Sequence, residues 1–277
     1  MKFKFSDSLI EGYERDGYAV FQEILPTSLI ADLRRATDRG RELARKQGEK
    51  ERQPVANQIQ RFQPIAKYDI DLKPFEDFRN LPELRDAVGR LLSPQHTFGN
   101  PRTYLGVFIE PQSTPYCTAW HQDWRHFHPA SRAGLTLEMK RDKALFNQIN
   151  CPLYRDDCTW VVPGSHLRDD TPAEREAFPE DVPTAPPLDG KSNEERERIC
   201  LDYCRRMPGA QRLQLDPGDF VVYRNTLWHM GNYVPYAKRA TILDLVDSPG
   251  FLAWPKKYGF LLKEELATID QRVELPA

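Results

Sequence analysis

The strongest chemical signal in this sequence is a set of metal-binding residue types that lie far apart along the chain. His121 and Asp123 stand two positions apart, and on a β-strand such residues point to the same side. They could be aimed at one metal ion, with His229 far downstream as a third ligand. Alone, His-x-Asp occurs by chance in many proteins. Together, two histidines and one carboxylate are typical of the facial triad of non-haem Fe(II) oxygenases, whereas a structural zinc site takes four protein ligands.

A possible carboxylate-binding group follows His229. Arg239 comes ten residues later and opens a run of β-forming residues, in which Thr241 would share its side of the strand. A guanidinium group and a hydroxyl group are together suited to hold a carboxylate. A strand-end arginine in a surface ion pair is common. The order His-x-Asp, His and then Arg is what favours the binding role.

Short runs of aliphatic and aromatic residues, most of them bounded by Pro or Gly, dominate the chain from about residue 103. They lie at residues 104–110, 144–150, 159–162, 212–215, 219–223 and 241–246. The run at 219–223 follows a turn at Pro217 and Gly218 and is expected to lead toward His229. Many short strands with turn residues between them favour a β-sandwich or a jelly roll.

Helical patterns come before and within this β region. Pro26 and Thr27 stand near the start of a predicted helix, and a second helix is predicted at 81–92. Residues 167–208 form a polar insertion rich in Asp, Glu, Arg and Pro, with a predicted helix at 193–206. An insertion of this length is either a lid or a decorative loop, and we expect it to cover the site and to carry specificity.

Four segments of the chain carry a resemblance to a known family. They are His121-Gln-Asp-Trp, Val161-Val-Pro-Gly-Ser-His, Pro217-Gly-Asp and the stretch from His229 to Arg239. Together they resemble the phytanoyl-CoA dioxygenase family of Fe(II)/2-oxoglutarate oxygenases, over about residues 10–246. Asp16-Gly17-Tyr18, followed by an expected apolar strand, also resembles the N-terminal opening of this family. The resemblance implies a mainly β fold with flanking helices, namely a double-stranded β-helix (jelly roll, cupin-like).

The resemblance also implies roles for the chemical residues. His121, Asp123 and His229 would bind Fe(II), and Arg239, with Thr241, would bind the distal carboxylate of the cosubstrate 2-oxoglutarate. O2 would be the oxidant, and succinate and CO2 would be released. Related halogenases have Gly or Ala in place of the carboxylate ligand. Because Asp123 is present, hydroxylation or a related oxidation of an unactivated C–H bond is favoured.

Five further residues are candidate members of the site. Lys67 stands at a spacing before the triad similar to that of a lysine near the cosubstrate in some family members, although an ordinary surface lysine is the favoured interpretation. Trp124 and Phe146 could form dry walls against a substrate, as could Trp120. His126 could contact a substrate or be a solvated loop histidine.

Composition excludes several classes of protein. The 277 residues include 39 Lys plus Arg and 41 Asp plus Glu, which argues against a general nucleic-acid binder. No apolar run approaches the length of a membrane helix, and the charged first residues are unlike a signal peptide. The odd count of five cysteines favours reduced packing residues. These features predict a cytoplasmic protein that acts on a small molecule; its oligomeric state is left open.

We expect a single oxygenase domain. It would have helical support at 1–95, a β core at 96–166 and 209–248, the insertion at 167–208 and a tail at 249–277. Two alternatives remain open from the sequence. One is a zinc-type metallohydrolase that uses the same His/Asp/His site, and the other is a non-enzymatic β-helix binding protein.

Overall fold

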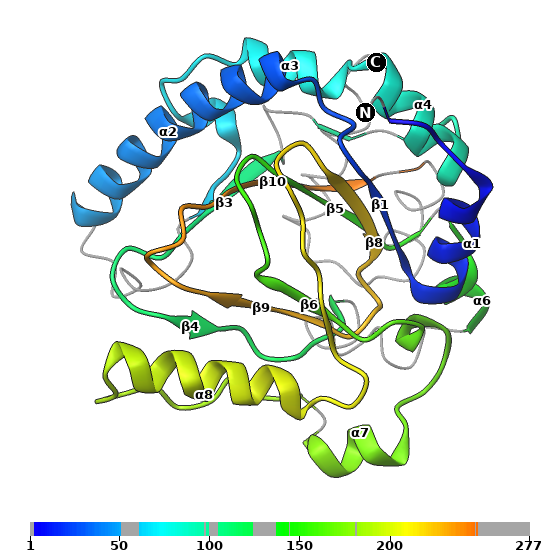
Figure 1. Cartoon of the computed structure of the whole chain (residues 1–277), viewed down its shortest axis with the longest axis vertical. Helices are drawn as coiled ribbons and strands as arrows, with labels where there is room; N and C mark the ends of the chain where they lie inside the picture. The colour runs from blue at the N-terminus through cyan, green and yellow to red at the C-terminus, as the bar shows by residue number, and fades with distance from the viewer. Residues whose placement is uncertain are drawn as a thin grey trace, which may run out of the picture.

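Two antiparallel sheets form the centre of the molecule, and helices flank them (Figure 1). The computed structural model describes residues 3–50, 61–96, 98–99, 105–123, 137–143, 145–180, 182–246 and 248. In spatial order, the larger sheet consists of β1 (Tyr18–Phe21), β8 (Phe220–Arg224), β5 (Asn147–Pro152), β10 (Ala240–Val246), β3 (Gly106–Ile109) and β2 (Arg61–Phe62). The smaller sheet consists of β4 (Tyr116–Cys117), β9 (His229–Tyr233), β6 (Thr159–Val161) and β7 (Gln211–Arg212).

The outer face of the larger sheet is covered by the N-terminal helices (Figure 1). They are α1 (Asp7–Asp16), α2 (Thr27–Lys50), the short 3-10 turn η1 (Ile65–Lys67), α3 (Lys73–Arg79) and α4 (Pro82–Leu91). Strand alternation decides which residues they bury. On β5, Ile149 and Cys151 point outward and join the main hydrophobic core, with Phe220 and Val222 of β8 beside them.

The inner faces of the two sheets pack against each other. Val161 of β6 contacts a cluster that contains Val221 and Tyr223 of β8 and Leu227. The two β8 residues have the opposite parity to those that contact the helices, as a two-residue repeat requires. The polar side chains of Gln148 and Asn150 on β5 also point inward. Polar residues are unusual in the core between two sheets, so this space is where a functional site is expected.

The insertion packs on the outer face of the smaller sheet. It contains α7 (Pro172–Ala177) and α8 (Asn193–Arg206); α6 (Leu137–Arg141) precedes it, and the 3-10 turn η3 (Ser165–Leu167) leads into it. Cys200, Tyr203 and Cys204 of α8 form a cluster with Trp228 and Met230, which flank His229 on β9. The sequence predicts that this insertion covers the site. Helix α8 lies along the smaller sheet, next to β4 and β9 (Figure 1), and packs against Trp228 and Met230, the two neighbours of His229 in the sequence.

Most predicted elements agree with the structure. The helices predicted near Thr27, at 81–92 and at 193–206 are α2, α4 and α8, and the β runs correspond to β3, β5, β6, β8 and β10. Two predictions were wrong. Residues 213–215 lie outside β7, and the N-terminal 95 residues are not purely helical support, because β1 and β2 pair with β8 and β3. The predicted tail at 249–277 lies outside the described residues.

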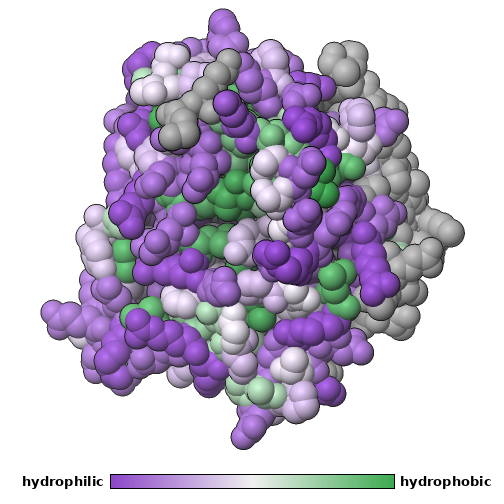
Figure 2. Space-filling model, turned by 45° about the vertical axis from the view of Figure 1, so that its right-hand side comes forward, coloured by the Kyte–Doolittle hydropathy of each residue, from purple (hydrophilic) through white to green (hydrophobic). Residues whose placement is uncertain are grey.

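The surface fits the charged composition. Figure 2 shows a mainly hydrophilic face, with hydrophobic side chains gathered in a recess near its centre. Among the described helices, none combines the length and the apolar character that crossing a membrane requires. All five cysteines are buried and free of disulfides, as predicted.

Candidate active site

The two histidines are brought together by backbone pairing. His229 begins β9, and His121 forms an isolated antiparallel bridge with it. The N–H group of each histidine donates to the carbonyl of the other, at 3.0 Å from His121 and 2.9 Å from His229. Asp123 is not in a strand, contrary to the reasoning from the sequence. Its N–H group donates to the carbonyl of Asn225 at 2.9 Å, which turns the chain so that its carboxylate meets the imidazoles.

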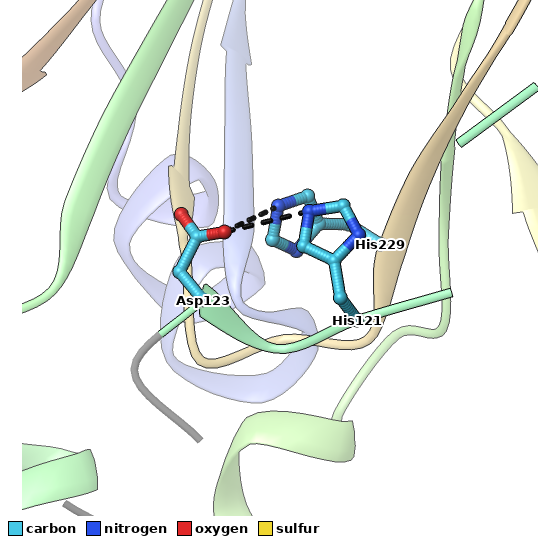
Figure 3. Close-up of side chains that lie close together, drawn as sticks. All are labelled: His121, Asp123 and His229. Atoms are coloured by element: carbon cyan, nitrogen blue, oxygen red, sulfur yellow. Dashed lines mark ion pairs between the residues drawn. The ribbon is translucent and has the colours of Figure 1, made fainter. Parts of the chain in front are cut away.

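The three side chains converge on one point between the sheets (Figure 3). Asp123 Oδ1 lies 3.4 Å from His121 Nε2 and 3.6 Å from His229 Nε2. The three ligand atoms all lie within 4.8 Å of one another, a spacing at which one ion can be shared. His229 is buried, whereas His121 and Asp123 are partly exposed. One side of the cluster is therefore open, as a site that admits further ligands requires.

The hydrogen bonds of the imidazoles select the tautomer that a metal needs. His121 Nδ1 donates to the carbonyl of Ala119 at 2.7 Å, and His229 Nδ1 donates to the carbonyl of Leu227 at 2.8 Å. A carbonyl only accepts, so each Nδ1 carries a proton, and Nε2 is the ring nitrogen that each histidine turns toward Asp123. Burial, together with the nearby His121, lowers the pKa of His229 well below its usual value. His229 is thus neutral at pH 7.

Arg239 lies just before β10, buried between the sheets. Its Nε donates to Asp156 Oδ2 at 2.7 Å, and the hydroxyl of Thr241 donates to the same oxygen. Aromatic rings flank the guanidinium, with the centroid of Tyr233 at 5.0 Å and that of Phe108 at 5.4 Å from its central carbon. Burial alone would lower the pKa of Arg239, but the Asp156 carboxylate outweighs this effect and raises it.

One nitrogen of Arg239 is left for a ligand. Nη1 is buried and has no hydrogen-bond partner within the part of the chain that the structure describes. A buried guanidinium N–H group without an acceptor is costly, and a carboxylate is its natural acceptor. The geometry thus meets the prediction that Arg239 and Thr241 lie on one side of the strand. The Thr241 hydroxyl, however, already donates its hydrogen bond to Asp156.

Several polar residues between the triad and Arg239 were not predicted. Tyr223 lies edge-on to His229, with 5.5 Å between the ring centroids, and its hydroxyl accepts a hydrogen bond from Gln148 Nε2 at 2.5 Å. Burial, with the Asp123 carboxylate as a second cause, raises the pKa of Tyr223. Asn150, on the same face of β5, keeps its buried Oδ1 without a partner among the described residues. Polar residues at alternate positions 148 and 150 were the available sequence signal.

The remaining predicted residues have less support. Lys67 is exposed at the end of η1, and none of its described contacts reaches the triad or Arg239. Phe146 is buried, and its carbonyl accepts the N–H group of Asn225, whose own carbonyl holds Asp123. Trp124 and His126 lie outside the described residues.

Trp120, which the sequence offers as a dry wall of the site, points away from it. It is fully buried in the cluster with α8, and its Nε1 donates to the carbonyl of Tyr203 at 3.4 Å. Alternation explains the difference, because neighbours of an inward-pointing residue point outward.

Comparison with known proteins decides the family. The family model described as "Phytanoyl-CoA dioxygenase (PhyH)" matches residues 13–233. The chain belongs to the phytanoyl-CoA dioxygenase family. Enzymes of this family use Fe(II), 2-oxoglutarate and O2, and this chain is accordingly an Fe(II)/2-oxoglutarate-dependent oxygenase. The match includes His121, Asp123 and His229 but ends before Arg239, so the position of the arginine rests on the structure.

Solved structures with the same fold have low sequence identity to this family member. AviO1 from Streptomyces viridochromogenes Tue57 is 18% identical, with 88% of this chain and 95% of that chain covered and a TM-score of 0.56. EctD from S. alaskensis, crystallised with 2-oxoglutarate and 5-hydroxyectoine, is 15% identical, with 89% and 77% covered and a TM-score of 0.54. The non-haem α-ketoglutarate-dependent carbocyclase SnoK from nogalamycin biosynthesis is 18% identical, with 88% and 85% covered and a TM-score of 0.50. None of the curated protein sequences matches the chain.

Proposed function

We propose that this protein is a non-haem dioxygenase that hydroxylates or otherwise oxidises an unactivated C–H bond of a small organic or natural-product substrate. The observation that carries the proposal is the convergence of the Nε2 atoms of His121 and His229 and the Asp123 carboxylate on one point. We infer that the two facing sheets are the halves of a double-stranded β-helix in a single oxygenase domain.

The residues fit a ferrous ion. Two imidazoles and one carboxylate on one side are the donor set of the facial triad, and three protein ligands leave room for a chelating cosubstrate and for O2. His121, Asp123 and His229 would hold the ion. When bound, Fe(II) and 2-oxoglutarate supply the oxidation of a C–H bond by O2, with release of succinate and CO2.

The other residues bind and orient. Arg239 would hold the distal carboxylate of 2-oxoglutarate through Nη1, with Thr241 acting on it through Asp156. The Tyr223 ring would keep His229 in place and exclude water from that side of the site. We keep Phe146 as a candidate substrate wall, because its backbone is one hydrogen bond from the Asn225 that positions Asp123.

The proposed substrate class is supported by the neighbours with the same fold. EctD was crystallised with the small molecule 5-hydroxyectoine, and SnoK comes from nogalamycin biosynthesis. Both act in small-molecule chemistry, which favours a small substrate for this chain over a macromolecule. SnoK is a carbocyclase, so the outcome proposed here includes oxidations other than hydroxylation.

An anaerobic titration tests the proposal. Fe(II)-loaded protein should develop the weak visible charge-transfer band of an iron chelate when 2-oxoglutarate is added, and air should then release succinate without added substrate. Asp123→Ala should abolish both signals. Asp157→Asn is the matched control, because Asp157 pairs with Arg212 at 2.8 Å on the surface and should leave both signals intact. Substrate turnover with Zn(II) and without O2 would instead establish the metallohydrolase.

A further inference from the structure

An ion pair that the oxygenase chemistry does not explain lies behind the candidate cosubstrate position. Asp156 and Arg239 are joined by the contact of 2.7 Å between Oδ2 and Nε, and their side chains are 3% and 4% exposed. Arg239 therefore has a carboxylate partner before any ligand arrives. A guanidinium group reserved for the cosubstrate alone would need no such partner.

Asp156 is held too firmly to leave when a ligand binds. Its Oδ1 accepts the N–H group of Cys158 at 2.9 Å, and its Oδ2 accepts from both Arg239 and Thr241. Its backbone exchanges two hydrogen bonds of 2.9 Å with Leu215, one through each N–H group. Burial raises the pKa of the Asp156 carboxyl, but Arg239 and the three hydrogen bonds outweigh this effect and hold it below its usual value. Asp156 thus remains an anion in place.

A second anion can bind Arg239 at Nη1 while Asp156 stays at Nε. In a guanidinium group, the N–H bond of Nε and those of Nη1 point in different directions. A carboxylate that binds at Nη1 would therefore lie beside Asp156 and would not displace it. Both carboxylates would then share one positive charge in a poorly screened interior, where like charges repel strongly.

We propose that Asp156 is a resident counter-ion of Arg239 that weakens the hold of the site on dicarboxylates, namely the cosubstrate 2-oxoglutarate and the product succinate. This inference rests on the proposed function. Asp156 is a positioning residue that sets affinity, so that the site is stable when empty and its product can leave. The rival role is purely structural, with Asp156 needed only to orient Arg239, and removal of its charge would then weaken binding.

Asp156→Asn separates the two roles. The amide keeps the shape of the carboxylate and one oxygen that accepts hydrogen bonds, but it removes the negative charge. Its NH2 group would face a group that now donates to Asp156, either the N–H of Cys158 or the donors of Arg239 and Thr241. Arg239 then lacks its counter-ion in the free protein, and a bound dicarboxylate would restore one. Asp157→Asn removes the same charge from the next residue without touching Arg239 and is the matched control.

The experiment is calorimetric titration of 2-oxoglutarate, and separately of succinate, into Fe(II)-loaded protein without O2. Asp156→Asn should bind both at least about tenfold more tightly than the wild type, or roughly 1.4 kcal/mol. Its melting temperature should be lower without ligand and should rise more with 2-oxoglutarate than that of the wild type. Asp157→Asn should match the wild type in both measurements.

Equal or weaker binding by Asp156→Asn would overturn the inference and leave the proposed function intact. The inference is also overturned if Asp156→Asn fails to fold even when it is purified in saturating 2-oxoglutarate, because the ligand should supply the missing charge. A wild-type protein that does not bind 2-oxoglutarate would instead refute the proposed function itself.

Discussion

Gly231 is the position at which a single added methyl group should disturb the site most. It lies two residues after His229 on β9, and a Cβ atom there would overlap Oη and Cζ of Tyr233 and lie 2.6 Å from its Cε2. The Tyr233 ring cannot simply give way. It is buried, lies 5.2 Å from the Tyr116 ring and packs 5.0 Å from the guanidinium carbon of Arg239. Gly231→Ala should therefore force the ring and the strand to shift.

The expected cost has two parts. Overpacking of a well-filled interior costs about 1–3 kcal/mol, and loss of the ring over a buried guanidinium adds roughly 1 kcal/mol. We expect the free energy of unfolding to fall by about 2–4 kcal/mol in urea titrations. The affinity for 2-oxoglutarate, measured by calorimetry, should fall as well, because Arg239 loses one wall.

A double-mutant cycle tests whether Tyr233 is the cause. Tyr233→Leu removes the Oη, Cζ and Cε atoms that the new methyl group would meet, so Gly231→Ala should cost much less in that background. The coupling should reach at least about 1 kcal/mol. If Gly231→Ala costs the same with and without Tyr233, or costs under about 0.5 kcal/mol, overlap with the Tyr233 ring is not the cause.

Two further predictions follow from buried charged and titratable groups. Arg239→Met should weaken 2-oxoglutarate binding by roughly 100-fold, because a charge-assisted contact is lost, while Fe(II) binding is spared. Arg239→Met should also lower the free energy of unfolding by about 3–5 kcal/mol, since Asp156 is left buried without its partner. In urea titrations, the double variant Arg239→Met/Asp156→Leu should recover this stability, but it should not recover the affinity for 2-oxoglutarate. Burial, with Arg224 as the next cause, lowers the pKa of His166 to about 4, against about 6.5 in an unfolded chain. The unfolded state thus binds the proton more readily, and stability should be lost as the pH falls below about 6.5, by about 2 kcal/mol at pH 5. His166→Gln should remove that loss, as urea titrations at pH 7 and pH 5 would show, and an unchanged pH dependence would refute the assignment.

The chemistry of the site was more predictable than its geometry. Residue type and order along the chain are local facts, and they were enough to indicate His121, Asp123, His229 and Arg239. The prediction that His121 and Asp123 lie on one strand was wrong. Their convergence depends on the backbone bridge between His121 and His229 and on the carbonyl of Asn225, which are contacts across about a hundred residues. No local pattern contains that information.

Asp156 shows a second limit. It stands beside Asp157 in a polar run that looks solvated, and nothing in the residue type separates the two. Asp156 is 3% exposed, whereas the side chain of Asp157 is 36% exposed. The difference comes from the bridge with Leu215, which turns one carboxylate inward to Arg239. Buried ion pairs formed by distant segments are for this reason found only from a structure.

The place of α8 follows from a pattern that the sequence did contain. Cys200, Tyr203, Cys204 and Met207 recur at helical spacing and form one apolar face, although the segment as a whole is polar. Where the chain enters β9, the alternation that turns His229 inward also turns its neighbours Trp228 and Met230 outward, where they need an apolar cover. The two faces match, so α8 belongs on the outside of the smaller sheet. Helix α8 packs against this strand through aromatic and sulfur-containing side chains. It therefore supports the strand that carries His229 and does not form a lid over the candidate site.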